Sequence, residues 1–152
     1  AANFNALEGL ALDGSGNLFG IDNGDVLATF DPATGQVIST MNLSINISSC
    51  GMAYDCATDR MLVANGSDWS IYSIDTATGQ ATLLRNLDPF FGPAWNPVGL
   101  AWDPVSRTAY LSTGGNLYNV DIDDPLAPPV NQGAYLGAQQ VSNLQYLPEC
   151  AP

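Results

Sequence analysis

Apolar and polar positions alternate in short runs along this chain, and one five-residue pattern occurs three times. The pattern Gly-x-Ala-x-Asp occupies positions 9–13, 51–55 and 99–103, with spacings of 42 and 48 residues. In each copy a short polar turn follows, and then three further apolar runs. No stretch of ten or more residues has the apolar period of a helix. The pattern therefore predicts a repeated unit of four antiparallel strands.

The later runs of each copy complete this unit. The second runs lie at 17–22, 60–65 and 107–112, the third at 27–31, 71–75 and 117–121, and the fourth at 37–41, 81–84 and about 130–135. Near-identical turns at 31–36 and 75–80 join the third run to the fourth, because Asp caps such a turn and Gly accepts a positive φ. In the third copy this turn is longer and rich in proline, at 121–129.

A repeat of about 45 residues with four strands per unit is typical of β-propeller blades. We therefore expect an all-β fold in a single domain spanning 1–152, with blades at about 5–42, 43–87 and 95–137. Residues 141–148 match the first strand of a blade, so a partial fourth repeat is expected there.

The repeat resembles a known superfamily. The first pattern, followed by a segment such as Ile-Tyr-Ser-Ile-Asp-Thr-Ala-Thr-Gly-Gln at 71–80, is similar to the blades of the NHL, YVTN and SMP-30-like propellers. The resemblance covers nearly the whole chain and implies the fold. It leaves function open, because these propellers include enzymes, sugar binders, surface proteins and scaffolds. Such propellers normally close with five to eight blades, so three blades leave sheet faces and edges to be covered.

The charge balance excludes several partners. Fifteen acidic residues face three basic ones, Arg60, Arg85 and Arg107, and the formal net charge is −12. Such a surface repels nucleic acid and disfavours anionic membranes. No run of eighteen apolar residues predicts a membrane span. The acidic, Lys-free composition and the start at Ala1 lead us to expect a secreted, extracellular or cell-surface protein.

No catalytic residue is predicted. Without His or Lys, the chain has no imidazole base and no Schiff-base amine. We expect a non-enzymatic protein without a cofactor. The resemblance to SMP-30-like lactonases implies a carboxylate-dependent metal site in the central channel as an alternative, with ligands from blades around the whole ring. Separately, the Asn-Gly turn at 22–25 makes Asp22 and Asp25 candidate calcium ligands, although an ordinary hairpin turn is favoured there. The loop 13–17 lacks the Gly and Glu that complete a calcium loop, so an ordinary turn is favoured there.

An insertion at 88–97 lengthens the second spacing and is rich in aromatic residues. Phe90, Phe91 and Trp95, together with Trp69, are candidates for an exposed surface that stacks on sugars or contacts a protein. A hydrophobic plug over the blade edges is the alternative interpretation, and it is slightly favoured.

The cysteines and the glycosylation motifs are also open. Cys50 and Cys56 bracket a strand and are about 20 Å apart when extended, too far for a disulfide. An intermolecular bridge from Cys56 to Cys150, or a bridge from Cys50 to either other cysteine, stays possible. Three asparagines, Asn42, Asn46 and Asn65, match the N-glycosylation pattern.

Three functions follow as hypotheses. The first is a self-assembling structural or adhesive component, in which copies of the chain form a ring-closing homodimer or a head-to-tail polymer. A fragment of a longer propeller has the same pattern. The second is a carbohydrate- or protein-binding module, and the third is a calcium-dependent hydrolase or lactonase.

Overall fold

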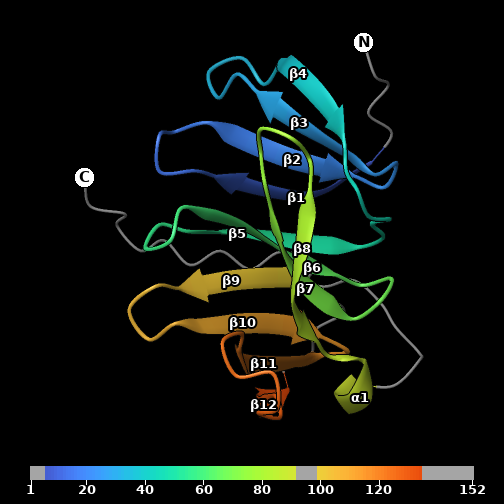
Figure 1. Cartoon of the computed structure of the whole chain (residues 1–152), viewed down its shortest axis with the longest axis vertical. Helices are drawn as coiled ribbons and strands as arrows, with labels where there is room; N and C mark the ends of the chain where they lie inside the picture. Colours follow the sequence, from blue (N-terminus) through green and yellow to red (C-terminus); the bar gives the residue numbers. More distant parts are fainter. Residues whose placement is uncertain (1–5, 92–98, 135–152) are drawn as a thin grey trace.

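The computed structural model describes residues 6–91 and 99–134 and contains three four-stranded antiparallel sheets (Figure 1). In each sheet the strands pair in chain order, as in a propeller blade. Blade 1 contains β1 (Leu7–Leu12), β2 (Leu18–Asp22), β3 (Val26–Phe30) and β4 (Val37–Asn42); blade 2 contains β5 (Cys50–Asp55), β6 (Arg60–Asn65), β7 (Ser70–Ile74) and β8 (Ala81–Asn86); blade 3 contains β9 (Gly99–Asp103), β10 (Thr108–Thr113), β11 (Asn116–Asp121) and β12 (Val130–Ala134).

The predicted all-β fold of repeated four-stranded blades is confirmed. One short helix, α1 (Asp88–Phe91), follows blade 2, and no helix of the described part is long and apolar enough to cross a membrane. The predicted strand at 141–148 lies outside the described residues.

Aspartate side chains close the turns of the blades. Eight of them accept a hydrogen bond from the backbone N–H two residues further along, which is the geometry of an Asx turn. They are Asp13, Asp22, Asp31, Asp55, Asp75, Asp103, Asp121 and Asp124. The N–H of Ala33 lowers the pKa of Asp31 in this way, and that of Ala77 lowers the pKa of Asp75. Many of the acidic side chains of the protein therefore stabilise turns.

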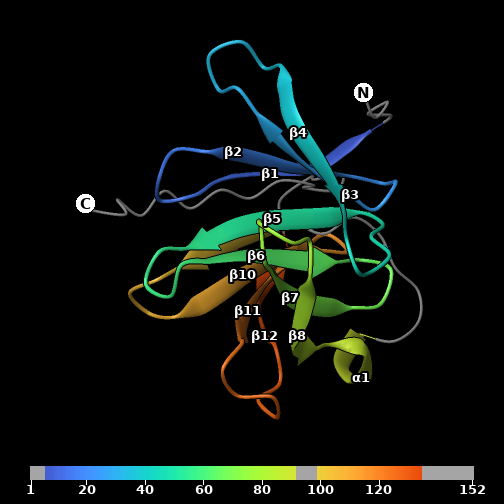
Figure 2. The ribbon, with the colours of Figure 1, turned by 45° about the horizontal axis from the view of Figure 1, so that its top comes forward.

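The first strands of the blades, β1, β5 and β9, lie side by side at the centre of the arc (Figures 1 and 2). Glycine allows this approach. A Cβ added at Gly51 would lie 2.3 Å from the backbone nitrogen of Leu100, and one at Gly9 would lie 2.8 Å from Cγ of Met52. Gly9 and Gly51 thus make room for the first strand of the next blade.

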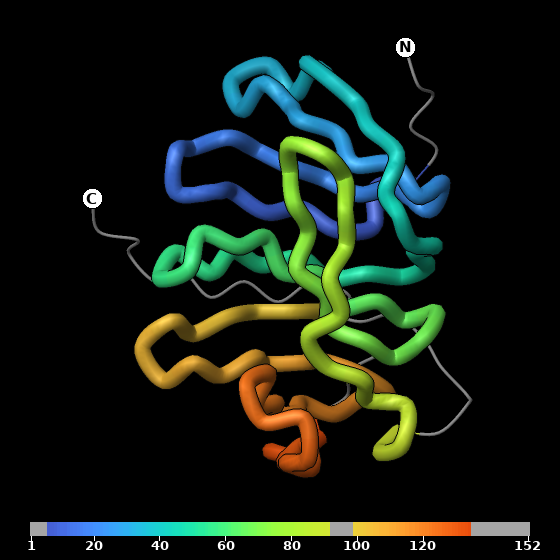
Figure 3. Tube along the Cα trace, viewed as in Figure 1, coloured from blue at the N-terminus to red at the C-terminus, as the bar shows by residue number. Residues whose placement is uncertain are grey.

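Two apolar clusters hold the blades together. One joins blades 1 and 2, with Ile21 and Leu27 packed against Met52 and Val63. The other joins blades 2 and 3 around Leu62, Trp102 and other side chains. The Cα trace in Figure 3 shows blade 2 between the other two, so both of its faces are covered.

Candidate functional site

One face of blade 1 is apolar and is not packed against another blade. Opposed residues of paired strands share a face, and Leu10 pairs with Gly20, while Leu12 pairs with Leu18. Leu10 and Leu12 are 39% and 47% exposed. We call this the open face and define it by Leu7, Leu10, Leu12, Leu18 and Val37.

The corresponding face of blade 2 is buried. Met52 and Val63 occupy the positions of Leu10 and Gly20, and they are 3% and 0% exposed. Blade 1 covers them with its opposite face, which contains Ile21 and Leu27. The open face is therefore built like a surface that a preceding blade covers.

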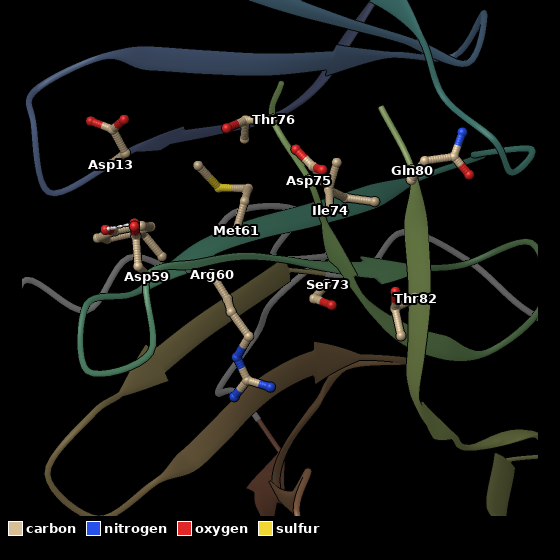
Figure 4. Close-up of a pocket in the computed structure, with 11 residues that line it drawn as sticks. Asp13, Asp59, Arg60, Met61, Ser73, Ile74, Asp75, Thr76, Gln80 and Thr82 are labelled. Atoms are coloured by element: carbon tan, nitrogen blue, oxygen red, sulfur yellow. Dashed lines mark hydrogen bonds between the residues drawn. The ribbon is translucent and has the colours of Figure 1, made fainter. Parts of the chain in front are cut away.

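A polar groove of about 470 Å³ lies between the turn after β1 and blade 2 (Figure 4). Its lining residues come from both blades and are mostly charged or hydroxylated: Asp13, Tyr54, Asp59, Arg60, Met61, Ser73, Ile74, Asp75, Thr76, Gln80 and Thr82. In Figure 4 the Arg60 side chain points away from Asp13 and Asp75, so carboxylates dominate the charge of the groove.

The groove carboxylates already have partners within the chain. Tyr54 donates its hydroxyl hydrogen to Asp59 at 2.6 Å, and this hydrogen bond raises the pKa of Tyr54 to about 12. Asp13 accepts hydrogen bonds from the backbone of Ser15 and Asn17. The arrangement can recognise hydroxyl groups. The sequence had no signal for this groove, because it forms only where two blades meet.

A buried carboxylate joins blades 2 and 3. Asp55 is fully buried and lies 3.0 Å from Nη2 of Arg60 and 3.9 Å from Nη1 of Arg107. Burial by itself raises the pKa of Asp55, but hydrogen bonds from Thr58 and Arg60 outweigh it, so the pKa is lowered. Arg107 also contacts Asp123 at 2.8 Å. This ionic cluster fixes the two blades to each other.

Arg85 is a buried cation without an acidic partner among the described residues. Its Nη2 donates to the carbonyl of Ala127, and its guanidinium lies 5.4 Å from the ring centre of Phe90. Its Nε and Nη1 have no hydrogen-bond partner in the described part of the chain. In the sequence Arg85 is identifiable only as one of three basic residues, and no local pattern predicts that it is buried.

The aromatic residues form a plug rather than one exposed surface. Trp69 is 5% exposed and stacks on Phe91, with ring centres 4.8 Å apart. Phe91 in turn contacts the edge of Tyr118 in blade 3. Trp69 is therefore not part of an exposed surface, and its contact with Phe91 favours the plug, because both side chains pack on the second interblade cluster. Phe90 is exposed, and Trp95 lies outside the described residues.

The candidate calcium ligands have structural roles. Asp22 is buried and accepts hydrogen bonds from the backbone of Gly24 and Val26. Asp25 accepts a hydrogen bond from the backbone of Ile47 at 2.5 Å. Within 6–91 and 99–134 no group of three or more His, Cys, Asp or Glu side chains could hold a metal ion.

The glycosylation candidates differ in accessibility. Asn42 and Asn46 are exposed, whereas Asn65 is buried. The amide of Asn65 donates to the carbonyl of Asn46 and accepts from the backbone of Ser48. Glycosylation of Asn65 is therefore incompatible with this fold, because its side chain holds the loop before β5.

Neither described cysteine forms a disulfide. Cys50 begins β5 and is buried, and burial raises the pKa of its thiol to about 12. Cys56 follows the end of the same strand and is half-buried. Cys150 lies outside the described residues, so the proposed bridges to it stay predictions.

Comparisons with known proteins bear on the fold. No family model matches the chain, and no curated protein matches its sequence. A catalytically inactive virginiamycin B lyase from Staphylococcus aureus, solved with quinupristin, is 14% identical, with a TM-score of 0.56 over 76% of this chain and 38% of the lyase. The chain has the fold of β-propeller blades.

Two further solved structures are similar. A Bacteroides thetaiotaomicron protein of unknown function is 16% identical, with a TM-score of 0.65 over 92% of this chain and 42% of the other. An auxiliary nutrient binding protein from Bacteroides ovatus is 18% identical, with a TM-score of 0.63 over 91% of this chain and 34% of the other. The matched region is thus less than half of each of these three structures.

Proposed function

We propose that this chain is a β-propeller module that assembles with further blades through its open face. In this proposal it is a secreted, non-enzymatic structural or adhesive component that needs no cofactor. The observation that supports assembly is the exposure of Leu10, whose counterpart in blade 2, Met52, is buried. An apolar sheet face of this kind is stable in water only when another surface covers it.

The secreted location and the structural role rest on composition. The chain has many more acidic than basic residues and contains no Lys. This surface disfavours nucleic acid and anionic membranes as partners, and it keeps an assembled protein soluble. The partner that covers the open face is either another copy of the chain or blades of another origin.

The mass of the native particle tests the assembly. Light scattering on a size-exclusion column, with and without reductant, is expected to give a species heavier than the 16.0 kDa chain. The same mass in reductant indicates that the blade faces, rather than disulfides, hold it. A monomer at all concentrations is incompatible with self-assembly.

The groove favours a second candidate function, the binding of a carbohydrate. Thr82, Asp59 and Asp75 line the same groove as the ring of Tyr54, and sugars are recognised by such combinations of hydroxyl groups, carboxylates and aromatic rings. A glycan array is expected to give a signal that the Thr82→Arg variant loses. Val105→Arg, on an exposed turn of blade 3, is the matched control and is expected to retain it. Equal signals from both variants would place any glycan elsewhere.

A further inference from the structure

We propose that Arg85 binds the carboxylate of a small molecule that also carries an apolar group. The site consists of Arg85 on β8, Phe90 on α1, and Leu126 and Ala127 in the long turn before β12. None of these residues belongs to the open face or lines the groove. The proposal is therefore independent of the proposed assembly and of the binding of a carbohydrate.

Arg85 is a buried cation whose hydrogen-bonding groups are only partly used. The residue is 1% exposed, and its Nε and Nη1 have no hydrogen-bond partner in the part of the chain that the structure describes. These two atoms carry three of the five N–H donors of a guanidinium. Burying a charge and its donors without acceptors is costly, and such groups in folded proteins usually have a partner. The free N–H groups therefore indicate a ligand that supplies acceptors.

The repeat does not require an arginine at this position. Arg85 pairs with Ile71 across β7 and β8, and the equivalent pair in blade 1 is Met41 with Leu27. Met41 packs against the first interblade cluster with its apolar side chain. The fold thus accepts a methionine where blade 2 has Arg85, so packing alone does not account for the charge.

Two departures from the repeat meet at Arg85. The insertion after blade 2 contains Phe90, whose ring centre lies 5.4 Å from the guanidinium carbon. The lengthened turn of blade 3, at 121–129, contains Ala127, whose carbonyl accepts a hydrogen bond from Nη2. Figures 1 and 2 show α1 and this turn at the same end of β8. The segments that differ from the repeat therefore enclose the arginine that also differs from it.

The charges around Arg85 favour an anion with a single charge. Arg85 has no acidic partner among the described residues. In the neighbouring turn, Asp121 and Asp124 accept backbone N–H groups of the turn itself, and Asp123 contacts Arg107. One guanidinium balances one negative charge, and a chain with a net charge of −12 repels a divalent anion more strongly than a monovalent one. A carboxylate meets this condition and accepts charge-assisted hydrogen bonds from arginine.

Exposed apolar side chains lie next to this cation. Phe90 is 41% exposed, and Leu126, the neighbour of Ala127, is 85% exposed. Phe90 covers the guanidinium, so the ligand enters when this exposed ring rotates aside, a motion that takes picoseconds to nanoseconds. An apolar group attached to the carboxylate then lies against Phe90 and Leu126 and removes their surface from water. The ligand class is therefore a small carboxylic acid with an aliphatic or aromatic group.

Thermal unfolding with phenylacetate tests this site, and phenylacetamide is the uncharged control ligand. At pH 7 and constant ionic strength, the Tm of the wild-type protein is expected to rise by about 4 °C when phenylacetate reaches about ten times its dissociation constant. Phenylacetamide has the same ring without the charge, and it is expected to change the Tm by less than about 1 °C. Inorganic phosphate is expected to give no saturable rise.

Arg85→Met gives blade 2 the residue that blade 1 has at this position. This variant is expected to fold with a Tm at least equal to that of the wild type, because an apolar side chain replaces an incompletely paired buried charge. It is expected to lose the response to phenylacetate. The matched control is Arg107→Met, which removes another arginine and is expected to keep the full response. Arg85→Gln replaces Arg85→Met if circular dichroism shows that the latter is unfolded.

Three results would overturn the carboxylate site. The first is an equal response to phenylacetate in the wild type and in Arg85→Met, and the second is an equal rise in Tm with phenylacetate and phenylacetamide. The third is a saturable rise with phosphate that exceeds the rise with phenylacetate, which would exclude the preference for a single charge.

A last variant examines whether the chain supplies its own carboxylate. Glu149 is the acidic residue that lies outside the described residues. If Glu149→Gln lowers the Tm of the wild type but not that of Arg85→Met, Glu149 is the partner of Arg85 and the ligand site is overturned. An unchanged Tm in Glu149→Gln supports an external carboxylate. The mass of the native particle is measured separately, so failure of this proposal leaves the proposed assembly standing.

Discussion

Asp55 shows how a single side chain can join two blades. It ends β5, where it caps its own turn, and it also receives Arg60 from blade 2 and Arg107 from the edge of blade 3. Removing one partner of a buried ion pair leaves the remaining charges uncompensated. The carboxylate is therefore expected to stabilise both the turn and the packing of blade 3 on blade 2.

Replacing Asp55 with Asn tests this role through its pH dependence. We expect the free energy of unfolding to fall by about 3 kcal/mol at pH 7, because Arg60 loses the buried carboxylate that it contacts and Arg107 keeps only the exposed Asp123. The pKa of Asp55 in the folded state lies below the unfolded value of 3.8. The wild-type advantage is therefore complete above the unfolded pKa and disappears as the pH falls through the folded pKa. Urea unfolding at a series of pH values and one protein concentration measures it.

The control is Asp123→Asn, which removes the exposed partner of Arg107. An exposed ion pair contributes little, so this variant is expected to lose less than about 1 kcal/mol at pH 7. A difference between wild type and Asp55→Asn that stays constant from pH 7 to pH 2 would contradict the ionic role of Asp55.

At the residue scale the sequence predicted turn caps but not their additional contacts. Asp31 and Asp75 cap their turns as expected, because an Asx turn depends only on residues two or three positions away. The burial of Asp55 and Arg85 depends on contacts with blade 3, which is far away in the sequence. No local pattern contains that information.

Among the structural elements, the first strands of blades 1 and 2 have little steric tolerance at their repeat glycines. Gly51 on β5 faces the backbone of β9, and a Cβ there would lie 2.3 Å from a main-chain nitrogen that cannot move independently. Gly20 on β2 is different, because its Cβ would meet the side-chain ends of Leu7 and Phe30. Blade 2 has Val63 at the position of Gly20, so a side chain fits this site in the blade.

The contrast predicts opposite outcomes for two Gly→Ala changes. Gly51→Ala is expected to destabilise the protein by about 3 kcal/mol, because blades 2 and 3 must move apart to accept the methyl group. Gly20→Ala is expected to change stability by less than about 1 kcal/mol, because the surrounding side chains can rotate. Urea midpoints at matched protein concentration compare the two. Equal losses would mean that the close approach of β5 and β9 is not what requires glycine.

The strands could be predicted well because each blade is a local meander. The apolar runs, the Asp caps and the turn glycines Gly35 and Gly79 all lie within one repeat, and both glycines have the positive φ that their turns need. The position of Trp69 was harder to predict. Its polar neighbours suggested exposure, but Phe91, 22 residues further along the chain, stacks on its ring.

For the whole molecule, charge opposes the association that the open face favours. Each copy has a formal net charge of −12, so two copies repel each other. The chain has few cations for ion pairs between copies, because Arg60 and Arg107 already contact acidic residues of their own chain and Arg85 is buried. Apolar contact must therefore supply the attraction, and salt can only weaken the repulsion.

Salt is thus expected to strengthen self-association of the chain. Raising NaCl from about 0.02 M to about 0.5 M shortens the Debye length well below 10 Å, and we expect the dissociation constant to fall about tenfold. Sedimentation equilibrium at several salt concentrations measures this. Near pH 4.1, the isoelectric point of the sequence, the same series is expected to be flat, because little net charge remains to be screened. Weaker association at high salt would instead indicate an interface held by ion pairs, which the three arginines of this chain are poorly placed to form.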